Sequence, residues 1–283
     1  MTDGRRPPPA LAVVATPIGN LGDVTPRAVE ALRTCDEVLA EDTRTTLSLL
    51  RALGVERPVS RLDDHVSRER ADALVARMRA GERFALVSDA GTPLVSDPGA
   101  LLVSRCVEAG LAVEARPGPS AVLAALVVSG FGAGGFRFVG FVPREGTARR
   151  SCLAAAARDP LATVFFEGPE RAAATLGELA PLCAPGRRAV VARELTKLHE
   201  EHLRGTVASL AEALTEAPPR GEVTVVLEGA PAAEEASGGE LDAALDAALA
   251  AGMRPADAAR EVARALGRKR AEVYARLLER EGK

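Results

Sequence analysis

Residues 84–99 read FALVSDAGTPLVSDPG, and this stretch indicates how the first part of the chain folds. Four apolar residues, Phe84 to Val87, precede a loop of Gly, Pro, Ser and Asp, which is typical of a buried strand that ends in a turn. The stretch that begins at Leu11, LAVVATPIGNLGD, has the same form. Apolar runs of this kind, without alternating polar residues, predict parallel strands that are covered on both faces.

The segments between and after these strands alternate between helical and strand-like patterns. We expect strands over 11–15, 37–40 and 84–87 and near Val59 and Val113, and helices over 26–33, 44–53 and 98–109 and after Ser67. Thr25 and Thr43 are the expected N-caps of the first two helices. A strand–helix–strand series with right-handed crossovers predicts a mostly parallel sheet with helices on both faces.

The second half has fewer helices for each strand and predicts a mixed sheet. Pro117-Gly118-Pro119 is the expected domain boundary, and Ser120 is the expected cap of the next helix. Strands are expected over 136–141, 162–166, 189–194, 201–204 and 222–228, and helices over 121–128, 148–157, 171–182 and 207–215. The fold class is therefore α/β, with a parallel-sheet N-terminal domain over 1–117 and an α+β second domain over 118–229.

The remaining C-terminal residues predict a small helical module. Residues 230–239 are rich in Ala, Glu and Gly and resemble a linker. Three helical patterns follow, over 240–251, 255–266 and 269–280, with breaks at Gly252 and Gly267. We expect a third domain over 240–283.

Composition and charge exclude several classes of protein. The net charge is −3, so the chain is not a globally basic nucleic-acid binder, although residues 253–283 hold nine Lys/Arg against five Asp/Glu. The four cysteines are far apart and predict buried free thiols rather than a metal site or disulfides, and no metal is expected. No apolar run is long enough to span a membrane, and we expect a cytoplasmic protein.

Four loops that follow strands are candidates for a ligand site. In α/β sheets, ligands bind beyond the carboxyl ends of the strands, and Gly and Pro make such loops stiff and backbone-lined. The loops cover residues 16–23, 88–99, 117–121 and 166–171. The sequence TPIGN lacks the G-x-G-x-x-G spacing of dinucleotide sites, and each loop taken alone is equally typical of an ordinary turn.

Taken together, seven ordered motifs resemble one known family. The motifs are ATPIGNLGDVTPRA, EDTRTT, LVSDAGTPLVSDPG, PGPSA, FVGF-P, RELTK and RGEV. Over residues 10–229 they are similar to the 16S ribosomal RNA cytidine 2′-O-methyltransferases of the tetrapyrrole-methylase-like superfamily, and the tail resembles them more loosely. The resemblance implies methylation in the decoding region of the small subunit, a homodimer, and S-adenosylmethionine bound in the cleft between two α/β domains.

The resemblance also implies which residues bind the cofactor. Carried over by motif, they are Pro17, Gly19, Asn20, Asp89, Ala90, Gly91, Thr92, Ser120, Ala121, Phe166, Leu195 and Gly221. The chain departs from the family at Asp63-Asp64-His65-Val66, where relatives carry His-Asp-His-Asn, at Gly168-Pro169-Glu170, and at Thr45, where a His is common.

Methyl transfer needs alignment of donor and acceptor and benefits from an acceptor for the hydroxyl proton. Asp42 and Glu167 are the preferred candidates for that base, ahead of Asp64, His65 and Glu194; for each, a helix cap or an ion pair is the alternative role.

Five cations are candidate contacts to RNA phosphates: Arg44, Lys197, Arg268, Lys269 and Arg270. Base stacking is not expected from so few aromatic residues. Two other functions stay open, namely methylation of a precorrin-type tetrapyrrole and a non-catalytic nucleotide-binding module.

Overall fold

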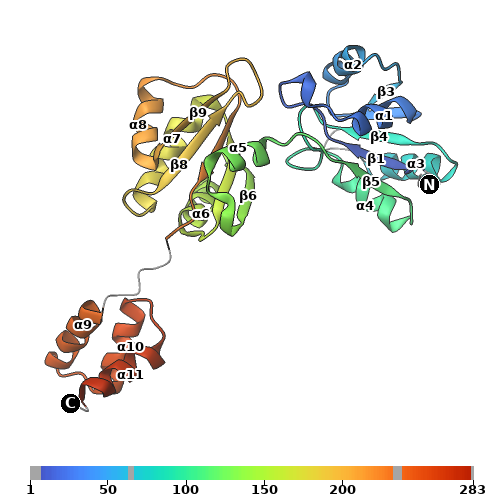
Figure 1. Cartoon of the computed structure of the whole chain (residues 1–283). Coiled ribbons are helices and arrows are strands. Elements are labelled where there is room, and N and C mark those ends of the chain that lie inside the picture. Colours follow the sequence, from blue (N-terminus) through green and yellow to red (C-terminus); the bar gives the residue numbers. More distant parts are fainter. Residues whose placement is uncertain (1–7, 63–66, 232–237, 282–283) are drawn as a thin grey trace, which may run out of the picture. The chain divides into compact units, whose positions relative to one another are not determined.

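The computed structural model describes residues 8–62, 67–231 and 238–281 and divides into two compact units, Met1–Ala230 and Pro231–Lys283. Figure 1 shows two sheets in the first unit and helices alone in the second. In the described ranges, none of the helices has the length and apolar character that crossing a membrane requires.

The first sheet has five parallel strands in the order β3-β2-β4-β1-β5. The strands are β1 (Leu11–Val14), β2 (Glu37–Ala40), β3 (Val59–Arg61), β4 (Phe84–Val87) and β5 (Val113–Arg116). Parallel pairing brings the carboxyl ends of β1, β2, β4 and β5 to one edge, where the Gly- and Pro-containing loops follow them. The predicted parallel sheet is confirmed.

Helices cover both faces of this sheet because its strands are apolar on both sides. Helices α1 (Pro26–Thr34) and α2 (Thr43–Ala52) pack on the face that includes Val14 and Val38. Helices α3 (Arg68–Arg79) and α4 (Ala100–Glu108) pack on the opposite face, which includes Phe84 and Leu86. A single turn of 3₁₀ helix, η1 (Leu21–Asp23), follows β1.

The capping residues explain where these helices begin. Thr25 accepts a hydrogen bond from the backbone N–H of Ala28, as expected. The prediction that Thr43 caps α2 is wrong. Asp42 is the N-cap, since its carboxylate accepts the backbone N–H of Arg44 and Thr43 is the first helical residue.

The second sheet is mixed, as predicted, with the order β6-β7-β10-β8-β9. Its strands are β6 (Phe136–Phe141), β7 (Ala162–Glu167), β8 (Arg188–Arg193), β9 (Glu201–Thr206) and β10 (Val223–Leu227). Strands β6 and β7 pair in parallel, whereas β10 pairs antiparallel with β7 and β8, and β9 pairs antiparallel with β8.

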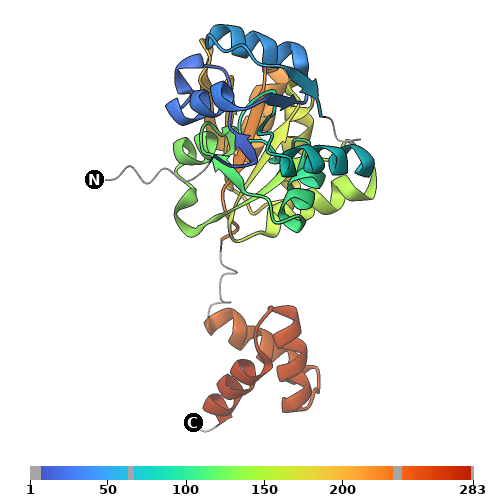
Figure 2. The same ribbon diagram turned by 90° about the vertical axis from the view of Figure 1, so that its right-hand side faces the viewer.

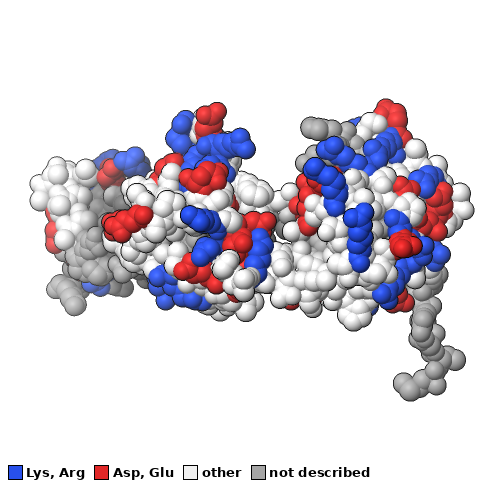
Figure 3. Space-filling view, turned by 90° about the horizontal axis from the view of Figure 1, so that it is seen from above, with Lys and Arg blue, Asp and Glu red and all other residues white. Residues whose placement is uncertain are grey.

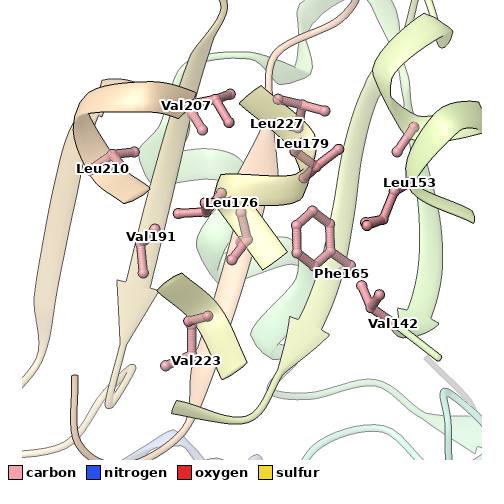
Figure 4. Close-up of a cluster of buried hydrophobic side chains, with 14 of the residues drawn as sticks. Val142, Leu153, Phe165, Leu176, Leu179, Val191, Val207, Leu210, Val223 and Leu227 are labelled. Atoms are coloured by element: carbon pink, nitrogen blue, oxygen red, sulfur yellow. The ribbon is translucent and has the colours of Figure 1, made fainter. Parts of the chain in front are cut away.

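The two faces of this sheet carry different helices. Helix α5 (Ala121–Ser129) covers the face of the sheet that includes Val164 and Val226. Ile18, from the loop after β1, belongs to the same buried cluster. Helices α6 (Gly146–Arg158), α7 (Pro169–Leu179) and α8 (Val207–Glu216) cover the other face, where the buried cluster around Phe165 and Leu176 lies (Figure 4). Short 3₁₀ turns, η2 (Gly132–Gly134) and η3 (Ala180–Leu182), complete the first unit.

The second unit is the expected helical module. Helices α9 (Gly238–Ala250), α10 (Pro255–Ala265) and α11 (Arg270–Glu281) pack against one another (Figure 2). Leu245, Val262 and Val273 are among the buried residues at their centre. Asp242 accepts two hydrogen bonds from Arg276, at 3.1 and 2.9 Å, which joins α9 to α11.

Candidate active site

A cavity of about 490 Å³ lies in the first unit, within the range of small-molecule sites. The loops after β1, β2 and β4 contribute Ile18, Glu41, residues 89–92 and residues 95–97, and the start of α5 contributes Ser120 to Val122. The second sheet contributes the ends of β6 and β7, Leu195 after β8, and residues 221–224 around the start of β10. The cavity is therefore built from both sheets.

Backbone hydrogen bonds hold two of the loops together beside the cavity. Thr16 and Gly91 form an isolated antiparallel bridge, with N···O distances of 2.8 and 3.1 Å. The Thr16 hydroxyl donates to the carbonyl of Ser88 at 3.2 Å, and the Thr92 hydroxyl donates to the carbonyl of Pro119 at 3.1 Å. These bonds fix the loops after β1 and β4 against each other and against the segment that precedes α5.

Two turns with strained backbones face the cavity. In the described part of the chain, the non-glycine residues with positive φ are Leu94, Ser96, Glu194 and Thr196. They flank Val95 and Leu195, which both line the cavity. Positive φ costs a non-glycine residue free energy and persists where the surroundings enforce it, often at ligand sites.

Carboxylates enforce the turn around Leu195. Glu194 Oε1 accepts the backbone N–H of Glu222 at 3.0 Å and the ammonium of Lys197 at 2.9 Å. These contacts lower the pKa of Glu194, with the Lys197 hydrogen bond as the main cause. Glu200 Oε2 accepts the backbone N–H of Thr196 at 2.6 Å. The turn is thus held from both sides of Leu195.

Nine of the twelve predicted cofactor residues line the cavity: Asp89, Ala90, Gly91, Thr92, Ser120, Ala121, Phe166, Leu195 and Gly221. Pro17, Gly19 and Asn20 are not among its lining residues, and their neighbour Ile18 is. The Asn20 carboxamide accepts the backbone N–H of Gly22 at 2.9 Å and caps η1.

The lining also includes residues that the sequence analysis missed. Val95, Ser96 and Asp97 lie in the loop over residues 88–99, which the sequence analysis named as a candidate without assigning these three residues to the ligand. Phe141 is the last residue of the FVGF motif, a signal that could have identified it. The lining carries five carboxylates, on Glu41, Asp89, Asp97, Glu167 and Glu222, and its described residues include no Lys, Arg or His.

Asp42 does not have the surroundings of a general base. It is not a lining residue, and its carboxylate is held by the backbone N–H, Nε and Nη2 of Arg44 at 2.8, 3.2 and 2.7 Å. Hydrogen bonding from the Arg44 side chain lowers the pKa of Asp42 to about 2. The geometry supports the alternative role, a cap and ion pair.

Glu167 is also a structural carboxylate in this arrangement. Its side chain is 0% exposed and forms an ion pair with Arg171. The Thr175 hydroxyl donates to Oε2 at 2.6 Å, the N–H of Gly168 donates to Oε1 at 2.9 Å, and Arg149 Nη1 lies 3.8 Å from Oε2. Because the carboxylate is enclosed by donors, the geometry supports the alternative role that the sequence left open for Glu167, an ion pair, which here joins β7 to α7.

The predicted RNA-contacting cations lie in different surroundings. The side chain of Arg44 is 89% exposed and pairs with Asp42, whereas that of Lys197 is 29% exposed and pairs with Glu194 and Glu222. Lys269 and Arg270 are exposed just before and at the start of α11, where Arg268 is half-buried. The candidates Asp64 and His65 lie outside the described residues.

Comparison with known sequences gives two family matches. The tetrapyrrole (corrin/porphyrin) methylases match residues 10–211, and the RsmI C-terminal HTH domain matches residues 235–281. Solved structures with the same fold include a cobalt precorrin-4 methyltransferase and a diphthine synthase. Their TM-scores are 0.58 and 0.57, each at 18% identity over 77% of this chain and over 94% and 90% of theirs.

Curated relatives are far more similar. A protein of Xylella fastidiosa named ribosomal RNA small subunit methyltransferase I is 48% identical over 79% of this chain and 82% of its own length. Proteins of the same name from Synechocystis sp. and Mycobacterium tuberculosis are 41% and 45% identical, over 96% and 94% of this chain and 98% and 91% of theirs. The chain therefore belongs to the tetrapyrrole methylase family and, within it, to the ribosomal RNA small subunit methyltransferases I.

Proposed function

We propose that this protein transfers a methyl group from S-adenosylmethionine to the ribose 2′-hydroxyl of a cytidine in the decoding region of 16S ribosomal RNA. The observation that carries the proposal is the cavity between the two sheets. Residues from five separate segments, each expected on the family resemblance to bind the cofactor, line this one cavity.

The chemistry of the lining fits the donor. Phe166 and Leu195 offer apolar surface for a flat base, and the backbone of residues 90–92 offers polar groups for the rest of the molecule. The carboxylate of Asp89 adds a negative charge to the lining that favours a cationic ligand. When bound, the donor supplies an electrophilic methyl group on a sulfonium. The residues around it orient the two reactants and exclude water.

No base is assigned to the reaction. Asp42 and Glu167 are both held by arginines, so we infer that alignment contributes more to the rate than proton abstraction by either group. The variant D42N keeps a residue type that caps helices well and should keep most of the activity.

The helical second unit is proposed to contact RNA phosphates. Lys269 and Arg270, at the turn between α10 and α11, are the exposed cations of this proposal, and Arg44 is a further candidate in the first unit. On the face seen in Figure 3, Lys and Arg are interspersed with Asp and Glu. Docking of RNA on that face would therefore depend on particular cations rather than on a uniform positive field.

We also propose a homodimer in the cytoplasm, where ribosomal RNA is found. Helix α5 supports the dimer, because Leu123 and Val127 on its outer side are 51% and 78% exposed. Light scattering of the wild type and of a V127D variant tests this: a mass near twice 29.4 kDa that falls to a single chain in V127D is expected. A monomeric wild type would contradict it.

The function is tested by the destination of a tritiated methyl group. Small ribosomal subunits from a strain lacking this protein, naked 16S RNA and a precorrin-type tetrapyrrole are each incubated with the protein and labelled donor. Label is expected in the RNA of the subunits. Label that enters the tetrapyrrole and not RNA would contradict the proposal, and an absence of transfer with measurable donor binding would favour a non-catalytic module.

A further inference from the structure

Phe141 is an exposed aromatic residue on the lining of the cavity. It is the last residue of β6, and it is 60% exposed although the chain contains only seven Phe, one Tyr and no Trp. Single exposed apolar residues are common on protein surfaces. What distinguishes Phe141 is that it lines the cavity and that an irregularity in the backbone of β6 places it there.

A β-bulge turns Phe141 toward the cavity. Phe138 pairs with Val164 and Phe141 pairs with Phe166, so three steps along β6 match two steps along β7. In a regular strand, residues 138 and 141 would point to opposite faces. The extra residue places both on the face that holds Val164 and Phe166.

The bulge depends on Gly140. This residue has a φ of 71°, which other residues rarely adopt, and a Cβ placed there would lie 3.2 Å from the hydroxyl oxygen of Ser96. Ser96 itself lines the cavity. The bulge therefore fits closely against Ser96 in the loop after β4.

Other aromatic rings support Phe141. The ring centroid of Phe166 lies 5.3 Å from that of Phe141, and Phe138 contacts Phe166 edge to face at 5.0 Å. Three of the seven Phe residues thus form one cluster, in which Phe166 and Phe141 line the cavity and Phe141 is the more exposed. An aromatic ring that is backed on one side and exposed on the other suits a second flat ring.

Although the low aromatic content of the chain argues against base stacking in general, we propose that Phe141 stacks on the base of the nucleotide that receives the methyl group. This inference rests on the proposed function. A ribose hydroxyl can reach a donor in the cavity only if its own nucleotide leaves the regular stack, and proteins hold such bases on aromatic side chains. Phe141 would compensate the lost stacking and fix the position of the ribose, without taking part in the transfer itself.

The test separates binding of the acceptor from binding of the donor. Variants F141A, F141L and F141Y are compared by steady-state methylation of small subunits and by calorimetric titration with S-adenosylhomocysteine. F136A is the matched control, because Phe136 is 39% exposed on the same strand and is not a lining residue. Thermal unfolding of each variant establishes that it is folded.

Loss of one stacked base predicts a KM for subunits that rises about 5- to 150-fold in F141A. We expect the affinity of F141A for S-adenosylhomocysteine to change by less than about twofold. The KM of F141Y should be close to that of the wild type because its ring still stacks, and the KM of F141L should stay close to that of F141A. F136A should behave as wild type.

An unchanged KM in F141A would overturn the inference. An affinity for S-adenosylhomocysteine that falls as much as the KM rises would also overturn the inference, since Phe141 would then contact the adenine of the cofactor. A wild type that neither binds this product nor labels RNA would instead refute the proposed function and remove the basis of the inference.

Discussion

Substitution of Gly221 by Ala should weaken both the fold and the binding of the donor. Gly221 has a φ of 81° and lines the cavity just before β10. A Cβ at this position would lie 2.1 Å from Oε1 and 2.3 Å from Cδ of Glu194. The carboxylate can move away, but it then loses the hydrogen bonds to the N–H of Glu222 and to Lys197 that hold the turn around Leu195.

The expected magnitude has two parts. Left-handed backbone in Ala costs roughly 1–2 kcal/mol of the free energy of unfolding. Displacing a partly exposed carboxylate from a backbone donor and an ammonium costs roughly 1–2 kcal/mol more. Gly186 provides the control, because its φ is 79° and a Cβ there meets nothing within 4 Å. The variant G186A should therefore lose only the first part.

The assay compares thermal unfolding and calorimetric binding of the donor product for G221A, G186A and the wild type. The difference between the two variants corresponds to roughly 2–8 °C in Tm for a unit of this size. Binding to G221A should be about 5- to 30-fold weaker, since Gly221 and Leu195 both line the cavity, and binding to G186A should be unchanged. Equal Tm values and equal affinities for both variants would refute the assigned role of Glu194.

Three further predictions concern charge and burial. R149A should lower the free energy of unfolding by about 3 kcal/mol in urea titrations, because it removes the buried cation 3.8 Å from the enclosed carboxylate of Glu167 and a hydrogen bond to Thr175. The exposed R150A should change this free energy by less than about 0.5 kcal/mol, and similar values for both variants would contradict the prediction. The pKa of Asp42 is depressed from 3.8 to about 2, so its charge stabilises the fold above about pH 4, and that contribution is lost as the pH falls toward 2. The difference in free energy of unfolding between wild type and D42N should therefore shrink over this interval, and a constant difference would argue against the ion pair. Burial raises the pKa of the Cys106 thiol to about 11, so this thiol should resist a disulfide reagent at mildly alkaline pH in the native protein and react after unfolding. Peptide mapping locates the label, and rapid labelling of Cys106 in the native protein would contradict the prediction and show that its surroundings open readily.

Much of the architecture could be predicted because it depends on local patterns. Short apolar runs such as Leu11 to Val14 become parallel strands, since only strands covered on both faces can be apolar throughout. Caps such as Ser67 and Ser120 mark helix starts through hydrogen bonds to residues three positions later. The cap of α2 was missed because Asp42 and Thr43 are both good cap residues, and the local sequence pattern does not distinguish them.

The features that could not be predicted arise from contacts between distant segments. The bulge at Gly140 depends on how β6 pairs with β7, and one extra residue reverses the face on which Phe141 lies. Leu94 and Glu194 adopt positive φ although side chains disfavour it, because their loops are held by the rest of the site. Glu167 follows a strand at the rim of the cavity, as the sequence indicates, but Arg149 and Arg171 reach it from α6 and α7.

The location of the donor is the most direct test of this account. A crystal structure of the protein with S-adenosylhomocysteine should have the ligand in the cavity between the two sheets, in contact with the backbone of Ala90 to Thr92 and with Phe166 and Leu195. Ligand bound elsewhere on the chain, with this cavity filled only by water, would contradict the account.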